Sequence, residues 1–415
     1  MPPIQDDRDQ RPRPGKVRRA VGSVMEFLAT EAGGGAILLA ATLGALAWAN
    51  SPWADSYGDV WGRRLTVGLG DWTLTHDLRH WVNEGLMTLF FFVVGLEIKR
   101  EIVSGELASM RNALLPVVAA VGGMVAPAVI YVSLNAGEPG ARGWGIPMAT
   151  DIAFAVGALS LFGSTAASAR VFLLSLAIVD DIGAIILIAV FYSAGLSWAA
   201  LGIAAGILAA MGALRRLGFG GLPAYGLLSV ALWIAASKSG VHPTIAGVAV
   251  GFLAPAGPAA GSDPPRPALA QRLLHGLHPW TSYAIVPLFA LANAGVELSR
   301  TSVADALTSR VAIGIVVGLV VGKLAGITGA SWVAVRLGLR APPEYGWTTT
   351  AGVAATAGIG FTVSLFIADL AFADAGLVAD AKIGILIGSV VAAVLGAITL
   401  RRARRAEPMS VSEDA

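Results

Sequence analysis

The stretch from Leu173 to Ile186 reads LLSLAIVDDIGAII and places two adjacent carboxylates, Asp180 and Asp181, inside an apolar run. The run extends over residues 171–192, and about 20 residues are enough to cross a bilayer. A carboxylate at such depth costs about 2.5–3.5 kcal/mol on insertion scales, so it is usually retained for function. The alternative is a structural pair that is satisfied by neighbouring backbone or by a lysine. We favour the functional interpretation.

The composition indicates a membrane protein. The chain has 415 residues, of which 55% are hydrophobic and 13% are charged, whereas a soluble domain carries about 25% charged residues. The fold class that we expect is an all-α polytopic membrane protein. The sequence contains no cysteine, which excludes disulfides, thiolate metal sites and cysteine nucleophiles.

Apolar segments recur along the chain and predict about twelve spans, each built on roughly 20 residues. We expect the spans near residues 24–49, 81–98, 113–135, 146–163, 171–193, 196–214, 222–238, 242–254, 282–298, 311–335, 347–371 and 380–400.

The distribution of Lys and Arg predicts the orientation. Cationic residues concentrate on the side of the two chain ends, and the positive-inside rule therefore places both termini in the cytoplasm. The expected organisation is a disordered basic tail at 1–21, one transmembrane domain at 22–402 and a cytoplasmic C-terminal tail at 403–415. A signal peptide ending at residues 47–49 is the alternative for the first span, but its apolar stretch is long and lies far from the start.

Three further polar sites interrupt the spans: Thr150 with Asp151, the lone cation Lys323, and the Gly-rich break at Gly358 and Gly360. Each has a structural alternative, namely a helix N-cap at Asp151, a snorkelling lysine and a close helix crossing. Taken together they suggest two discontinuous helices around an ion site near the membrane midplane, with charges that compensate the exposed helix ends.

Charges also cluster after the second span, in the sequence GLEIKRE at 95–101. Solvated charges at a membrane exit are the simplest interpretation of this cluster.

Long motifs throughout residues 22–402 resemble the NhaA family of sodium/proton antiporters. Discontinuous helices around an ion site are known in part from this family. The expected helix breaks and the family motifs are therefore not independent evidence. The motifs are residues 91–101, 150–154 (TDIAF), 176–181 (LAIVDD), 239–242 (SGVH), 278–280 (HPW), 287–295 (PLFALANAG), 322–323 (GK) and 358–362 (GIGFT).

The resemblance implies a twelve-helix inner-membrane protein with inverted repeats, whose fourth and eleventh spans are unwound and cross. It implies that Asp180 and Asp181 bind the ion and the protons, that Lys323 pairs with Asp180, and that Thr150 and Asp151 lie at the crossing. It links a second set to the pH response of the transporter: Glu97, Glu101, Lys238 and His242.

The chain departs from the family pattern at three positions. Leu274 and Gln271 stand where the family's best-known member has a glutamate and a lysine, and Glu84 replaces an aspartate. The resemblance therefore implies antiport with an altered pH profile.

The expected activity follows from competition. Na⁺ or Li⁺ is a hard cation that binds carboxylate and hydroxyl oxygens, and protons bind the same carboxylates. A dyad that opens alternately to each side then exchanges Na⁺ for H⁺, electrogenically if two protons move per ion, and so serves sodium and pH homeostasis. No cofactor and no nucleic-acid partner are expected beyond the ions and the lipid bilayer, and a homodimer through residues 51–80 is suggested by the resemblance.

Two other classes of protein share features of this sequence. Gly68-Leu69-Gly70-Asp71 matches the Gly-x-Gly-Asp of intramembrane aspartyl proteases, but Asp71 lies in a charged loop outside any span. A channel would share the buried carboxylates but would dissipate gradients without proton coupling. No nucleotide-binding loop is present in the sequence, which argues against an ATP-driven pump.

Overall fold

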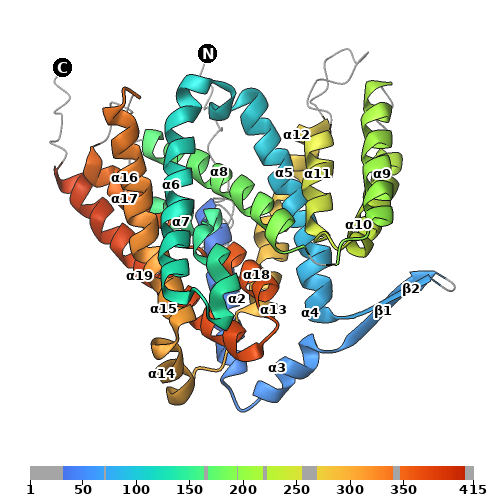
Figure 1. Cartoon of the computed structure of the whole chain (residues 1–415), viewed down its shortest axis with the longest axis horizontal. Coiled ribbons are helices and arrows are strands. Elements are labelled where there is room, and N and C mark those ends of the chain that lie inside the picture. The colour runs from blue at the N-terminus through green and yellow to red at the C-terminus, as the bar shows by residue number, and fades with distance from the viewer. Residues whose placement is uncertain are drawn as a thin grey trace, which may run out of the picture.

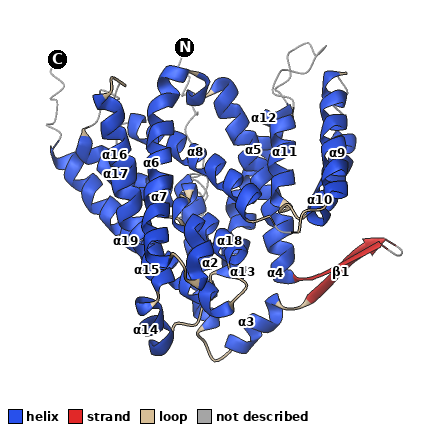
Figure 2. Cartoon of the chain, in the orientation of Figure 1, coloured by secondary structure: helices blue, strands red, loops and turns tan. Residues whose placement is uncertain are grey.

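The structure is a computed structural model that describes residues 31–69, 72–162, 167–193, 195–217, 222–254, 269–339 and 346–406. Within this part of the chain, helices dominate and the strands form a single hairpin (Figures 1 and 2). The expected tail at 1–21, Gly70 and Asp71 of the protease motif, and residues 407–415 lie outside the described residues.

The first half of the chain begins with one apolar helix and a short amphipathic one, followed by the hairpin. Its elements are α2 (Glu31–Ala49), α3 (Ala54–Trp61), β1 (Arg64–Leu69), β2 (Trp72–Asp77), α4 (Leu78–His80), η1 (Trp81–Leu86), α5 (Met87–Ser104), η2 (Glu106–Ala108), α6 (Met110–Asn135), η3 (Pro139–Met148), α7 (Ile152–Phe162) and α8 (Ala167–Phe191).

The second half contains further helices and a second interrupted segment. Its elements are α9 (Trp198–Arg216), α10 (Leu222–Ser239), α11 (Thr244–Leu253), α12 (Leu269–Trp280), η4 (Thr281–Ile285), α13 (Val286–Asn293), α14 (Arg300–Thr308), α15 (Arg310–Val317), η5 (Gly318–Gly322), α16 (Lys323–Arg336), α17 (Trp347–Thr356), α18 (Phe361–Ala371) and α19 (Ala375–Ala406).

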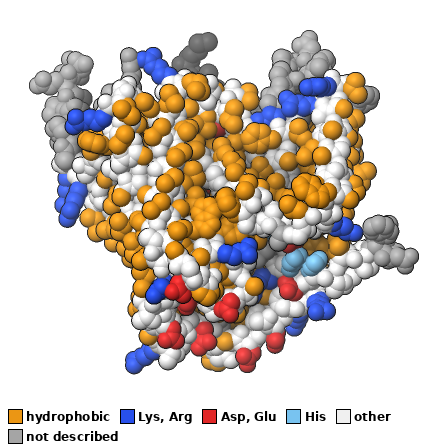
Figure 3. All heavy atoms as spheres, in the orientation of Figure 1, with side chains coloured by type: hydrophobic (Ala, Val, Ile, Leu, Met, Phe, Trp, Pro, Cys, Tyr) orange, Lys and Arg blue, Asp and Glu red, His pale blue; other side chains and the backbone are white. Residues whose placement is uncertain are grey.

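Within the described residues, each expected span overlaps a helix or an interrupted helix, and residues 24–30 of the first span lie outside them. By length and apolar composition, five helices of the described part can cross a membrane, and seven if two bent helix pairs each count as one span. The pairs are α2–α3, bent by 115°, and α17–α18, bent by 47°. The protein is thus a mostly helical membrane protein, and the count of twelve stays a prediction. The space-filling view agrees, because apolar side chains cover the middle of the visible face and most charged side chains lie toward its two ends (Figure 3).

Residues 51–80 are more structured than the loop that the sequence suggested. They contain α3 and the antiparallel hairpin, in which Leu65 pairs with His76 and Val67 pairs with Leu74. The hairpin projects from the helical body at the end where α3, α4 and α14 lie (Figure 1). We call this end the hairpin side.

Small residues allow the helices to pack closely, as is usual in membranes. A Cβ atom on Gly122 of α6 would lie 2.4 Å from the carbonyl oxygen of Gly326 in α16. A Cβ atom on Gly247 of α11 would lie 2.3 Å from the carbonyl oxygen of Thr88 in α5. These two crossings belong to different packing groups: α6 also packs on α8 and α15, whereas α11 also packs on α10.

Lys99 of α5 corrects one expectation. The interpretation of residues 95–101 as solvated end charges is wrong for this side chain, which is buried. Its ammonium group donates hydrogen bonds to the carbonyl oxygens of Phe252, at 2.7 Å, and Ala254. A cation at the carboxyl end of α11 satisfies carbonyls that the helix leaves unpaired.

Candidate functional site

Two interruptions in helices meet in the interior. The first lies between η3 and α7, where Ala149, Thr150 and Asp151 are not helical. The second separates α17 from α18 at residues 357–360. Each interruption exposes backbone groups that a continuous helix would pair, so the interior needs other partners for them.

The two interruptions supply partners to each other. The backbone N–H of Asp151 donates to the carbonyl oxygen of Ile359 at 2.6 Å. The hydroxyl of Thr150 lies 2.8 Å from the carbonyl oxygen of Ala357. Segments about two hundred residues apart in the chain are thereby held in contact.

Asp151 links two helix N-termini. One carboxylate oxygen accepts the backbone N–H of Phe154 in the first turn of α7, at 3.1 Å. The other accepts the backbone N–H of Thr362 at 3.0 Å and its hydroxyl at 2.7 Å, in the first turn of α18. Asp151 is therefore the N-cap of α7 and also a partner of the break between α17 and α18. A buried carboxylate at the positive ends of two helices is electrostatically favoured.

Lys323 and Asp180 form a buried ion pair. The side chains of both are 0% exposed, and the Lys323 ammonium bonds to Asp180 Oδ2. Thr150 completes the group, because its hydroxyl lies 3.0 Å from Lys323 Nζ and 2.6 Å from Asp180 Oδ2. The π-helical turn η5 immediately precedes Lys323, and such turns are frequent at functional sites.

Two carboxylate groups remain with oxygens available for a ligand. Asp180 Oδ1 is buried and has no hydrogen-bond partner among the described residues. Asp181 is 6% exposed, and it interacts electrostatically with Asp180, Glu97 and Asp151. Unpaired buried carboxylate oxygen is costly, and a hard cation or a proton would satisfy it.

Gly360 is needed where the breaks meet. A Cβ atom on it would lie 2.7 Å from the carbonyl oxygen of Ala149 and 2.7 Å from a methyl group of Leu319. We expect Gly360→Ala to lower the thermal stability of the purified protein and to reduce transport, since the two interruptions must move apart. Gly329→Ala is the control, because nothing lies within 4 Å of the added atom and Ala favours a helix. Unchanged stability in Gly360→Ala would contradict this packing.

The residues of the expected pH response are spread over α5, α10 and the segment that precedes α11. Glu97 Oε1 lies 3.7 Å from Nε2 of His278 in α12, and a Glu101 oxygen accepts the backbone N–H of Glu106 at 3.2 Å. Lys238 lies in the last turn of α10.

His242 lies close to the second break. Its ring packs edge to face on Phe366 of α18, with 5.1 Å between the ring centroids. Its Nδ1 is 2.8 Å from the hydroxyl of Thr244. Leu274, at the position of a family glutamate, is buried against Val93 and Leu96.

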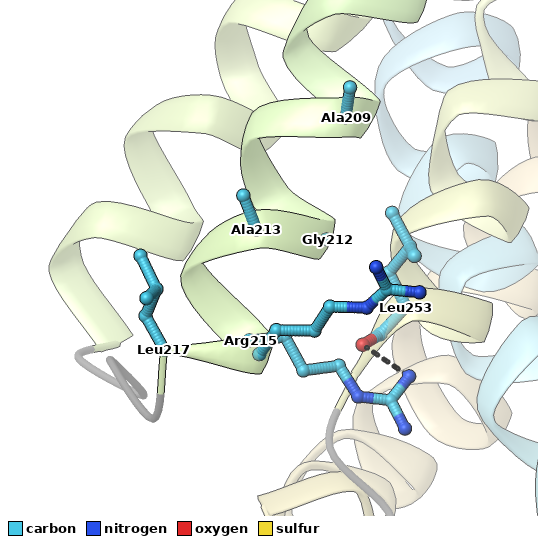
Figure 4. A pocket seen from close by; sticks show the side chains of 7 residues that line it. Ala209, Gly212, Ala213, Arg215, Leu217 and Leu253 are labelled. Carbon is cyan, nitrogen blue, oxygen red and sulfur yellow. Dashed lines mark hydrogen bonds between the residues drawn. The ribbon is translucent and has the colours of Figure 1, made fainter.

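An open pocket of about 870 Å³ lies elsewhere, between α9 and the end of α11 (Figure 4). Its lining includes Arg215, which contacts the carbonyl oxygen of Leu253 at 3.5 Å. None of the residues at the two breaks lines this pocket, so it is separate from the buried carboxylates.

The sequence analysis missed a second ion pair, in which Lys382 of α19 is buried and Asp369 of α18 is partly exposed. It also missed the amide pair formed by Asn83 and Asn293, which lies beside it. Lys382 sits three residues inside an expected span, and this position was the one available signal.

A helical membrane protein with two interrupted helices around a buried carboxylate–lysine pair has the architecture of a secondary transporter, a class in which substrate sites lie at such breaks. The comparisons with known proteins identify the family. The family model described as Na+/H+ antiporter 1 matches residues 25–400, and the chain belongs to this family.

Its relatives cover nearly the whole chain. The protein named Na(+)/H(+) antiporter NhaA from Rhodospirillum rubrum is 47% identical over 92% of this chain and 98% of its own length. The NhaA antiporter of Acidovorax sp. is 48% identical over 88% of each chain, and NhaA 2 of Sorangium cellulosum is 43% identical over 94% of this chain and 92% of its own. Proteins of this family are transporters, not enzymes, and use no cofactor.

Proposed function

We propose that the chain is an electrogenic antiporter that exports Na⁺ or Li⁺ in exchange for protons across the bacterial inner membrane. Family membership supports exchange of Na⁺ for H⁺. The observation that carries the site is the arrangement at Asp180, where Lys323 holds one carboxylate oxygen and the other has no hydrogen-bond partner in the part of the chain that the structure describes. A carboxylate in this position can release a lysine and accept a cation.

In the proposed exchange, Na⁺ and protons compete for the same carboxylates. Na⁺ would bind Asp180 and Asp181, with the Thr150 hydroxyl as a further oxygen, and would displace the Lys323 ammonium from Asp180. Protons would displace Na⁺ from the same carboxylates on the opposite side. Alternating exposure of a single competitive site therefore couples the two fluxes without a separate device.

Electrogenic exchange lets the membrane potential drive export. If two protons enter for each Na⁺ that leaves, one net charge crosses per cycle, and the field contributes about 2.3 kcal/mol per 100 mV. Either Lys323 or Asp180 would carry the second proton.

The finer architecture is part of the proposal. Twelve spans with inverted repeats would place the two breaks on discontinuous helices that cross near the membrane midplane. The bonds between Asp151 and Thr362, and between Thr150 and Ala357, support this crossing.

We extend the proposal to regulation and assembly. Glu97, Glu101, Lys238 and His242 would adjust activity to pH, and His242 has a direct contact with α18 through Phe366. The hairpin has exposed strands that end far from the helical body, and strand edges pair readily with a second copy. A homodimer through this hairpin is therefore expected.

The function is tested in everted membrane vesicles that carry a respiratory pH gradient. Adding Na⁺ or Li⁺ should release the quenching of a pH-sensitive dye, whereas choline should not. Collapse of the electrical potential with valinomycin and K⁺ should change the rate if exchange is electrogenic. A response to Na⁺ that is equal in vesicles lacking the protein would refute antiport, and Na⁺ flux without proton movement would indicate a channel.

A further inference from the structure

A second polar cluster lies on the hairpin side, away from the dyad. Asp369, in the last turns of α18, contacts Lys382 of α19, with 3.4 Å between Oδ1 and Nζ. Its other oxygen accepts a hydrogen bond from the Asn83 amide of η1 at 3.3 Å. Asn83 and Asn293 of α13 exchange hydrogen bonds of 2.7 and 3.2 Å.

These four side chains join four separate elements. Asn83 belongs to the helix that continues into α5, whereas Asp369 belongs to the second half of the helix that breaks at Gly358–Gly360. Asn293 is fully buried and Lys382 is 7% exposed. Buried polar groups of this kind are retained when all members are paired and fix one arrangement of the surrounding helices.

The cluster is unsuited to be a second cation site. Arg79 lies 6.0 Å above the ring of Tyr57, and it acts electrostatically on Lys382. Asp369 is thus a single carboxylate that is already paired with Lys382, and a further cation, Arg79, acts electrostatically on the same lysine. An additional Na⁺ would be repelled at this position, so the cluster has to act by holding helices together.

The polar cluster and the break beside the dyad lie on the same helix, α18. α18 starts at Phe361, beside Asp151 and the break, and Asp369 lies eight residues later, which is roughly 12 Å along a helix. α13 packs on α18, with the rings of Phe289 and Phe366 6.2 Å apart between their centroids. Phe289 and Phe366 are both buried, so apolar side chains fill the space between α13 and α18 at this point, and an ion could pass here only if the two helices separated.

We infer that the Asp369–Lys382 ion pair and the Asn83–Asn293 amide pair form a latch that closes the ion path on the hairpin side. This inference rests on the proposed antiport and its orientation, in which the hairpin side faces outward. Opening to the outside requires α18 and α13 to separate, and the latch has to break each time. Weakening it should shift the population toward the outward-open form.

The test uses the absence of native cysteine. Ala290 is fully buried, one turn before Asn293 on α13, so Ala290→Cys supplies a single thiol behind the latch. The rate at which a membrane-impermeant maleimide labels this thiol is measured in whole cells, where the reagent is outside, and in everted vesicles, where it is on the cytoplasmic side. The latch is removed with Asp369→Asn and Lys382→Gln together, so that neither partner of the ion pair remains as an unpaired charge.

We expect the double variant to be labelled about tenfold faster from outside the cell, the factor that corresponds to one lost charge-assisted hydrogen bond, and more slowly from the inside. Asp380→Asn, which removes a carboxylate from the neighbouring turn of α19, should leave both rates unchanged. Exchanging the charges, with Asp369→Lys and Lys382→Asp, should restore slow outside labelling.

Labelling does not require transport, so the outcome is separate from the test of antiport. An unchanged outside rate in a folded double variant, judged by size-exclusion chromatography, would overturn the latch. A rise of equal size from both sides would also overturn it, because that result indicates general loosening. Faster labelling only from the inside would show that the cluster closes the cytoplasmic side of the path, which contradicts the inference.

Discussion

Asp181→Asn is expected to reduce Na⁺-driven proton movement in everted vesicles to the level of vesicles without the protein. The substitution keeps the shape of the side chain but removes a carboxylate that can bind both Na⁺ and H⁺. Loss of one buried charged partner costs at least about 2 kcal/mol in binding, roughly thirtyfold in apparent affinity. The loss of a proton-binding group from the dyad should then abolish coupling as well.

The control is Asp305→Asn in α14, which removes an equal charge from an exposed position and should leave exchange intact. Both variants should reach the membrane in equal amounts, judged by immunoblot. Full exchange in Asp181→Asn would exclude this residue from the site and would leave Asp180 and Asp151 as the candidates.

Lys323→Met is expected to have the largest effect on stability. Asp180 would remain as a buried charge without its ammonium partner, and breaking such a pair from one side costs about 3–5 kcal/mol. The melting temperature of the detergent-purified protein should fall clearly. The double variant Lys323→Met/Asp180→Asn should recover much of the loss, since no unpaired charge remains in the interior.

The surface variant Arg300→Met should have a melting temperature near that of wild type, because Arg300 is exposed. If the single and double variants at Lys323 and Asp180 melt at the same temperature, the two side chains are not energetically coupled and the ion pair has no structural role.

The same variants distinguish the two candidates for the second proton. If Lys323 carries it, Lys323→Met retains exchange that no longer responds to the membrane potential. If Asp180 carries it, potential-dependent exchange persists in Lys323→Met and is lost in Asp180→Asn.

The sequence by itself determined the membrane class and the approximate positions of the helices, and it singled out the residues of the proposed site. Apolar runs of sufficient length predict helices wherever they occur, and a carboxylate pair, a lysine or a Gly-x-Gly within such a run is conspicuous against its neighbours. Asp180, Asp181, Lys323 and Gly358 were all visible in this way. The family motifs added the expected antiport, which the comparisons support.

Tertiary structure alone decided which of these groups meet. Lys323 and Asp180 are 143 residues apart, Asp151 and Thr362 are 211 apart, and no local pattern reports such contacts. Lys99 had the sequence context of a solvated end charge, yet it is buried because the end of α11 lies against it. Asp369 and Asn83 had no distinguishing neighbours at all. Their pairing depends on how helices distant in the chain pack, and helix packing is governed by the shape of whole faces and not by the residues beside each polar group.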